Sequence, residues 1–303
     1  MSVKNIKAVI CAGLCAACFF GNGMTAQAAA SGSWELSDNG KYWMYFYTPG
    51  DPAMDEWIEY EGKEYYVDSK GRMKTGWVTN KDDGERYYMG QDGTKCFNTF
   101  ASDGKYVGPD GTNLKRFDTY RKELKRELKA SGKKLKEQPG FAVADFNADG
   151  YKDMAVFNRP VNPDKVIKLA VWDPEEEKFT LAAETDLENT QMSRLTCDPD
   201  SSTTWLVMES NNGWDRDFFS MEQDTNWLEH RWGFTYKTND WGDPIGCVNG
   251  DEVSWEDWEQ TLAEANAQAG TVIQLQILPL DEVHIAQAAD IAPSEEELLL
   301  WEE

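Results

Sequence analysis

Acidic side chains at alternating positions form one compact motif near the middle of the chain. Asp145, Asn147, Asp149 and Asp153 occupy positions 1, 3, 5 and 9 of a calcium-type loop, and the carbonyl of Tyr151 falls at position 7. Carboxylate, amide and carbonyl oxygens at this spacing can converge on one hard cation. The motif therefore predicts a calcium site made by these five residues. An Asx turn that holds no metal is the alternative interpretation.

The loop departs from an EF-hand in two ways. Val156 stands where an EF-hand has a bidentate glutamate, and an apolar run after the loop predicts a strand instead of a helix. This strand–loop–strand pattern, D-x-N-x-D-G-x-x-D, resembles the calcium loops of FG-GAP and VCBS-type repeats and of many extracellular Firmicutes domains. The resemblance implies a calcium-stabilised extracellular domain. With few protein ligands, we expect a Kd for calcium of about 10⁻⁴ to 10⁻³ M.

Aromatic residues recur at regular intervals in the first third of the chain. Trp34, Trp57 and Trp77 lie 23 and 20 residues apart, and Phe97 follows 20 residues later. Asn-Gly and Asp-Gly turns separate these aromatic runs, and such turns are strong signals of β-hairpins. One two-stranded hairpin is too small to bury its own aromatic face. The repeat therefore predicts a solenoid of stacked hairpins over residues 31–112.

The repeat unit combines a Gly-Trp step, a Tyr-Tyr pair and glycine turns. It closely resembles the cell-wall-binding (choline-binding) repeats of Gram-positive surface proteins, over about 80 residues. The resemblance implies a non-catalytic module that attaches the protein to a wall polymer, with aromatic rings caging a quaternary ammonium. It implies as ligand-binding residues Trp34, Tyr42, Trp57, Tyr65, Trp77 and Tyr87.

Two repeats differ from the family pattern just before the tyrosine pair. Glu64 replaces an aromatic residue in one repeat, and Arg86 replaces it in the next. A carboxylate there could attract a cation, whereas a guanidinium would repel one. Teichoic acid or another glycan is therefore an alternative to choline as the ligand. Two further interpretations stay open: the rings only hold the hairpins together, or they recognise host glycans, as related repeats in clostridial toxins do by resemblance.

Motifs of known catalytic centres are missing from the sequence. There is no G-x-S-x-G or H-E-x-x-H, and His230 and His284 are the only histidines. Glycoside hydrolysis needs only two carboxylates, which chance supplies in a chain with 54 Asp and Glu. Glu209, Asp215 and Asp217, near two tryptophans, are the best candidates. We predict no catalytic residue, with a wall-attached glycan-processing hydrolase as the alternative.

Charge and the N-terminal segment indicate where the protein works. The 303 residues carry a formal charge of −24, which argues against binding to nucleic acid or to anionic lipid. Residues 1–28 have the pattern of a signal peptide, with Lys4 and Lys7, an apolar stretch and the cleavage site Ala26-Gln27-Ala28. The apolar stretch is too short to span a bilayer. The sequence therefore predicts secretion, with the cell wall or surface of a Gram-positive bacterium as the location.

Three cysteines lie beyond the signal peptide. Cys197 and Cys247 form the natural disulfide pair because both lie in the second half of the chain, whereas Cys96 lies in the repeats. These three cysteines have no C-x-x-C spacing that would indicate zinc.

A basic segment follows the repeats. Residues 113–138 are expected to form a helix and linker, and residues 115–136 hold ten Lys and Arg against three acidic residues. This basic face could meet a phosphate-rich wall polymer. The alternative is a solvated helix that packs against an acidic domain.

Residues 139–303 predict an α+β domain with an antiparallel sheet, which carries the calcium loop and binds a partner. Ser254 with Asp257 and Ser294 with Glu297 predict two helix N-termini, because each pair can form a capping box. Residues 271–278 predict a late strand. The expected fold class is mainly β: a hairpin solenoid followed by this α+β domain.

Overall fold

The computed structural model describes residues 32–133, 138–185, 191–198, 203–221, 223 and 225–302. The predicted signal peptide lies outside these residues, as do residues 134–136 of the expected basic helix. The chain divides into two compact units, one of the residues up to Met73 and one that begins at Lys74. Every strand pair within the described ranges is antiparallel, which confirms the predicted mainly β fold.

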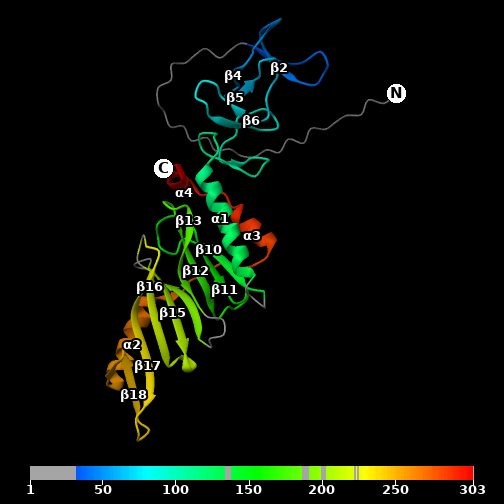
Figure 1. The fold of residues 1–303 in the computed structure, drawn as a ribbon. Coiled ribbons are helices and arrows are strands. Elements are labelled where there is room, and N and C mark those ends of the chain that lie inside the picture. The colour runs from blue at the N-terminus through cyan, green and yellow to red at the C-terminus, as the bar shows by residue number, and fades with distance from the viewer. Residues whose placement is uncertain are drawn as a thin grey trace. The chain divides into compact units, whose positions relative to one another are not determined.

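The first unit consists of short strands (Figure 1). They are β1 (Ser33–Leu36), β2 (Trp43–Thr48) and β3 (Asp51–Pro52) in one sheet, and β4 (Glu56–Tyr60) and β5 (Lys63–Val67) in a hairpin. Glu61 and Gly62 join β4 to β5 with φ of 52° and 73°, the pair of positive angles that a type I′ turn requires. Tyr45, Ile58 and Val67 are fully buried at the centre of this unit. The predicted hairpins are thus present here.

The second unit opens with two more hairpins and a long helix. These elements are β6 (Gly76–Thr79), β7 (Arg86–Met89), β8 (Thr99–Phe100), β9 (Tyr106–Val107) and α1 (Lys115–Gly132). The apolar stripe of α1 is buried at Phe117, Tyr120, Leu124 and Leu128, as its three- and four-residue spacing predicts. Basic residues of α1 pair with acidic ones, such as Lys125 with Asp290 at 3.1 Å and Arg126 with Glu123 at 2.7 Å.

A five-stranded sheet lies against α1, in the order β13-β12-β11-β10-β21. Its strands are β10 (Gly140–Ala144), β11 (Asp153–Phe157), β12 (Val166–Asp173), β13 (Lys178–Glu184) and β21 (Leu278–Pro279). Two C-terminal helices, α3 (Glu282–Ala289) and α4 (Glu295–Glu302), cover the same face as α1. Phe141, Met154 and Trp172 of the sheet are fully buried beneath these helices.

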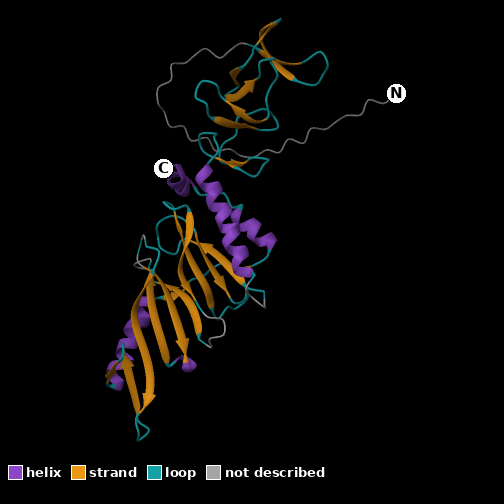
Figure 2. Cartoon of the chain, viewed as in Figure 1, coloured by secondary structure: helices purple, strands orange, loops and turns teal. Residues whose placement is uncertain are grey.

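A seven-stranded sheet follows, in the order β19-β18-β17-β16-β15-β14-β20. Figure 2 draws its long strands in orange. Its strands are β14 (Met192–Cys197), β15 (Thr204–Ser210), β16 (Asp215–Met221), β17 (Leu228–Thr238), β18 (Pro244–Val248), β19 (Asp251–Val253) and β20 (Thr271–Val272), with a 3₁₀ turn at Asn211–Gly213 and helix α2 (Trp255–Ala269). Successive side chains of a strand point to opposite faces. On β15, Trp205 and Val207 accordingly pack toward α2, and Leu206 packs toward the five-stranded sheet. The second unit therefore has helices outside and two facing sheets inside.

The predicted strand over residues 271–278 is wrong. The segment instead crosses between the sheets: Thr271–Val272 pairs with β14 of one sheet, and Leu278–Pro279 pairs with β10 of the other. Ile273, Leu275 and Ile277, between these contacts, pack into the core that the two sheets share. Their alternation therefore reflects burial of a connection and not a continuous strand.

The two predicted helix N-termini are confirmed. The Ser254 hydroxyl accepts a hydrogen bond from the backbone N–H of Asp257 at 3.1 Å, and α2 begins at the next residue. Ser294 and Glu297 bond reciprocally, at 3.2 and 2.7 Å, at the start of α4. Helix α3, whose N-cap is Asp281, was not predicted from the sequence.

The expected Cys197–Cys247 disulfide is absent, because both residues are free cysteines in the described structure. Cys197 ends β14, whereas Cys247 lies on β18, and three strands of the sheet separate these two. A disulfide needs Cα atoms within about 7 Å, and strands in a sheet lie about 4.8 Å apart, so the sheet order forbids the bond. Cys96 is also free. None of the described helices is long and apolar enough to cross a membrane.

Trp301 of α4 joins the helices to the five-stranded sheet and provides a test of this fold. Its ring is 3% exposed, and its centroid lies 5.4 Å from that of Phe117 and 6.1 Å from that of Trp172. Trp301→Ala should lower the free energy of unfolding by about 3–5 kcal/mol, because it leaves a large cavity. Leu299→Ala, at a site that is 67% exposed on the same helix, should change it by less than about 0.5 kcal/mol. Urea denaturation would measure both, and equal losses would contradict this packing.

Candidate functional site

The predicted ligand residues of one repeat lie on opposite faces of their hairpin. Trp57 is directly opposite Tyr66 across the β4–β5 ladder, with ring centroids 5.3 Å apart. Tyr65 is the next residue along β5, so it points to the other face. The β6–β7 hairpin repeats this arrangement, with Trp77 opposite Tyr88 at 5.1 Å and Tyr87 on the other face.

Rings from two different hairpins do meet in the first unit. Trp34 of β1 packs on Tyr65 of β5, with centroids 5.1 Å apart and planes at 56°. Trp34 also meets Tyr45 edge-on at 5.3 Å. Both Trp34 and Tyr65 keep part of their surface exposed. Of the six predicted ligand residues, these two come together in a partly open aromatic pair.

A basic side chain lies over Tyr87. The Lys95 Nζ is 4.3 Å from the centroid of Tyr87 and 5.2 Å from that of Phe97, a ring that is 46% exposed. The Tyr87 hydroxyl donates to the Asp83 carboxylate at 2.9 Å. Burial, together with this hydrogen bond, raises the pKa of Tyr87 to about 12, so the phenol stays neutral. This site therefore holds an ammonium group over a neutral, electron-rich ring.

Two more predicted ligand rings carry cations of the protein. The guanidinium carbon of Arg86 lies 5.5 Å from the ring centroid of Trp77, and the Lys105 Nζ lies 5.7 Å from it. In the first unit, the guanidinium carbon of Arg72 lies 5.1 Å from the centroid of Tyr42. Distances below about 6 Å are those of cation–π contacts. Three of the six predicted ligand rings therefore face a basic side chain.

Of these four cations, only Arg86 was expected near the ligand rings from the sequence. A signal for them was present: Arg72 and Lys105 each follow a turn glycine directly, and Lys95 follows one by two residues. The turn brings the next residue back along the repeat, which places its side chain beside the ring.

The predicted calcium loop joins β10 to β11 and is closed by its own hydrogen bonds. The Asp145 carboxylate accepts from the backbone N–H of Gly150 at 2.9 Å and of Asp149 at 3.3 Å. Asp149 accepts from the Tyr151 N–H at 2.8 Å and from the Asn147 side chain at 3.0 Å. The loop oxygens therefore gather at one turn, where Asx-type bonds hold them.

Asp153 points inward from the same loop. Its side chain is fully buried in β11, and its two oxygens accept from the backbone N–H of Phe146 at 2.8 Å and of Trp172 at 2.9 Å. Burial raises the pKa of Asp153 well above its usual value. Asp153 thus ties the loop to β12.

The donor set fits a calcium ion only in part. Asp145, Asn147, Asp149 and the Tyr151 carbonyl supply oxygen ligands of the kind calcium prefers. Asp153 would have to give up its two backbone bonds to join them. Within the described ranges, no group of three or more His, Cys, Asp or Glu side chains lies close enough to hold a metal ion. Calcium binding stays a prediction.

Glu209, the first candidate for glycoside hydrolysis, is held between two arginines. Its Oε1 lies 2.7 Å from Arg194 Nη1 and 3.2 Å from Arg216 Nε. The two arginines lie on β14 and β16, the strands on either side of β15, which carries Glu209. Glu209 itself is 9% exposed. A carboxylate fixed by two guanidinium groups links three strands of the sheet.

The other two candidate carboxylates also bond within the sheet. The Asp217 Oδ1 lies 3.1 Å from the His230 Nε2 across β16 and β17. The Asp215 Oδ1 accepts from the backbone N–H of Tyr236 at 3.0 Å. All three carboxylates therefore have partners that stabilise the sheet.

Comparisons with known proteins concern only part of the chain. No protein-family model and no curated protein matches it. Among solved structures, it resembles choline binding protein F from Streptococcus pneumoniae at 30% identity, over 26% of this chain and 25% of that protein, with a TM-score of 0.23. The choline binding domain of Spr1274 from the same organism is 29% identical over 28% of this chain and 98% of that domain, also with a TM-score of 0.23.

The modular Cpl-1 endolysin, complexed with a peptidoglycan analogue, is 13% identical over 63% of this chain and 39% of the endolysin, with a TM-score of 0.24. The chain thus spans about a quarter of choline binding protein F and less than half of the endolysin. TM-scores of this size do not establish a shared fold for the chain.

Calorimetry can test the calcium prediction. With a Kd of about 1 mM, calcium at about 10 mM should raise the free energy of unfolding by about 1.4 kcal/mol. Asp145→Ala should abolish the binding heat and the rise in Tm, because it removes the first ligand. Asp173→Asn, in the β12–β13 turn, should leave both unchanged. Identical Tm values with calcium and with chelator would contradict the prediction.

Proposed function

We propose that the aromatic hairpins of residues 31–112 attach this protein to a cell-wall polymer, and that the domain of residues 139–303 serves a non-catalytic interaction role. This assignment makes the chain a secreted surface protein. Calcium bound at the loop of residues 145–153 would add to the stability of that domain.

The proposal rests on the cation–π contacts between basic side chains and the aromatic rings of the hairpins. Tyr42, Trp77 and Tyr87 each present a ring face to a basic side chain at 4.3–5.7 Å. A face that accepts a guanidinium or ammonium group is also suited to a ligand cation or to the C–H face of a sugar. Rings that served only as core filler would be covered by apolar side chains.

The same contacts bear on which polymer is bound. A choline group would compete with Lys95 for Tyr87 and with Arg72 for Tyr42. A glycan or a polyol phosphate could keep these basic groups as hydrogen-bond donors while it stacks on the rings. The hairpin cations also provide local positive charge on a chain whose formal charge is −24. We therefore favour a glycan or teichoic-acid backbone over choline for these two sites.

The ion pairs of the seven-stranded sheet support the non-catalytic assignment. Glu209 is fixed by Arg194 and Arg216, and Asp217 is bonded to His230. A general acid needs a carboxyl that can reach a substrate oxygen and exchange a proton. Glu209 is instead 9% exposed and held in ion pairs by two guanidinium groups, which places it poorly for that role.

Sedimentation of the full chain with isolated Gram-positive cell walls tests the proposal. We expect retention, and Tyr42→Ala combined with Tyr87→Ala should weaken it about 5- to 25-fold, because each cation–π or stacking contact contributes about 1 kcal/mol. Trp214→Ala, which removes a comparably exposed ring (43%) far along the chain, should not affect retention. No retention of the unmodified protein would overturn the proposal.

A second experiment separates choline from glycan. Lys95→Ala should strengthen binding to a choline-substituted resin about 2- to 5-fold, because it uncovers the Tyr87 and Phe97 rings. Lys63→Ala, at an exposed position on β5, is the matched control. Weaker resin binding by Lys95→Ala would show that Lys95 does not compete with choline.

A further inference from the structure

The solvent-exposed side of α1 carries a row of basic side chains. They are exposed and spaced by seven, four, three and four residues, which is the spacing of one helix face. This basic stripe consists of Lys115, Lys122, Arg126, Lys129 and Lys133. At a rise of about 1.5 Å per residue, it is about 27 Å long. The apolar stripe of the same helix is buried, so the two stripes lie on different sides of α1.

The acidic residues of α1 are not part of the stripe and are engaged in contacts. Only 12–23% of each acidic side chain is exposed, in Asp118, Glu123 and Glu127. Asp118 accepts a hydrogen bond from the Asn113 side chain at 2.6 Å. Glu127 pairs with Lys168 of β12 at 3.0 Å, and Glu123 pairs with Arg126 at 2.7 Å. Arg126 is nevertheless 61% exposed, so the exposed charges of the helix are all basic.

Most of the stripe also lacks a neutralising partner. Lys115, Lys122 and Lys133 form no ion pair with any residue that the structure describes. The Lys129 Nζ lies 3.6 Å from Glu282 of α3, and these two side chains are 52% and 88% exposed. Water and salt screen an ion pair so exposed, so a polyanion could replace Glu282. The stripe therefore has an excess of positive charge that is open to solvent.

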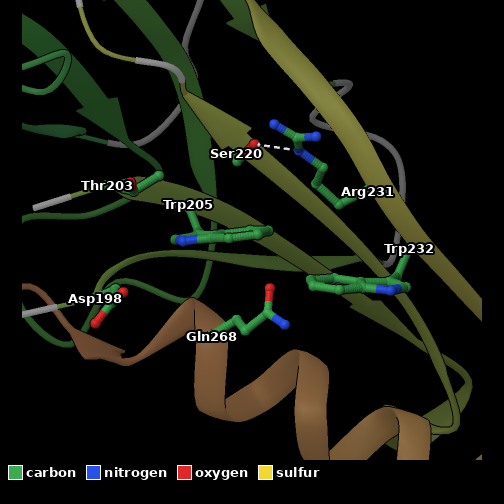
Figure 3. A pocket seen from close by; sticks show the side chains of 7 residues that line it. All are labelled: Asp198, Thr203, Trp205, Ser220, Arg231, Trp232 and Gln268. Carbon is green, nitrogen blue, oxygen red and sulfur yellow. Dashed lines mark hydrogen bonds between the residues drawn. The ribbon is translucent and has the colours of Figure 1, made fainter. Parts of the chain in front are cut away.

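The cavity beside the end of α2 differs in this respect. It has a volume of about 480 Å³, and Arg231 and Gln268 are among the residues that line it (Figure 3). The Arg231 guanidinium donates to the Ser220 hydroxyl at 2.8 Å and pairs with Glu229 at 3.0 Å. The charge of Arg231 is thus already balanced, whereas the charges of the three unpaired lysines on α1 are not.

We propose that the basic stripe of α1 binds a linear polyol-phosphate chain. Lysine is a compact charge on a flexible stem, so a row of lysines suits separate phosphates along a flexible polymer. Each ammonium group can form charge-assisted hydrogen bonds with a phosphate oxygen. A polymer that lies along one helix face would contact several of these lysines at once.

The charge of the whole chain favours this polymer over nucleic acid. Double-stranded DNA carries about one negative charge per 1.7 Å of its axis. A duplex on the stripe would bring many of these charges toward the surface of a chain whose formal charge is −24. A thin chain with more widely spaced phosphates meets less of this repulsion.

The inference rests on the proposed wall attachment for the source of the polymer, because teichoic acids have a polyol-phosphate backbone. It uses none of the hairpin rings, and α1 is a separate element that follows the last hairpin. The two binding surfaces can therefore be tested separately.

Fluorescence anisotropy of a labelled poly(glycerol phosphate) with the full chain tests the proposal. Tyr42→Ala with Tyr87→Ala provides the background, so that binding at the hairpin rings does not mask the stripe. In this background, Lys115→Gln, Lys122→Gln and Lys133→Gln together should weaken binding about 10- to 25-fold, at about 2- to 3-fold per lost phosphate contact. Binding should also weaken as salt is added, because salt screens exposed charges.

A second triple variant is the matched control. Lys63→Gln, Lys178→Gln and Lys237→Gln remove the same charge at three exposed positions outside α1. In the same background, this variant should change the affinity less than twofold. Glutamine forms helices about as well as lysine, so the three substitutions in α1 do not put its folding at risk.

Three outcomes would overturn the inference. Equal losses in the two triple variants would show that net charge alone governs binding. Unchanged affinity of the α1 variant would show that the stripe does not bind the polymer. Tighter binding of duplex DNA than of poly(glycerol phosphate) would contradict the choice of partner. In each case, retention on cell walls of the α1 variant with Tyr42 and Tyr87 intact would leave the proposed attachment by the hairpins standing.

Discussion

Hairpins of two short strands cannot bury their own aromatic side chains, and this constraint governs the first third of the chain. Each ring must find apolar surface on a neighbouring element. In the first unit, Trp34 of β1 therefore packs on Tyr65 of β5. In the second unit, Tyr106 of the last hairpin packs on Phe117 of α1, with centroids 5.2 Å apart. The last hairpin thus shares a core with the helix that follows.

The same constraint explains why cations lie over the rings. The hairpins leave part of the surface of Tyr42, Trp77 and Tyr87 exposed. Basic residues that follow the turn glycines lie over these rings, as Lys95 does over Tyr87. Apolar stacking therefore builds the scaffold, and the remaining ring surface, paired with positive charge, is available for recognition. Under the proposed function, the same rings would serve as scaffold and as binding surface.

Local patterns in the sequence predicted most elements, whereas contacts between distant elements could not be predicted from the sequence. Ser254 and Ser294 were sufficient to place two helix starts, because a capping box involves only four consecutive residues. Residues 271–278 alternate like a strand, but burial between two sheets produces the same alternation. The predicted Cys197–Cys247 disulfide was wrong because the spacing of two cysteines does not encode the order of strands in a sheet. Asp153 was predicted as a ligand, and its bond to the Trp172 backbone arises only when β11 and β12 pair.

Hydrogen–deuterium exchange of the full chain, with and without solubilised cell-wall fragments, would test the central claim most directly. We expect slower exchange in the hairpins between residues 32 and 112, strongest around Tyr42, Trp77 and Tyr87, where rings and cations meet. Binding that left these hairpins unchanged and protected only residues 138–302 would contradict it.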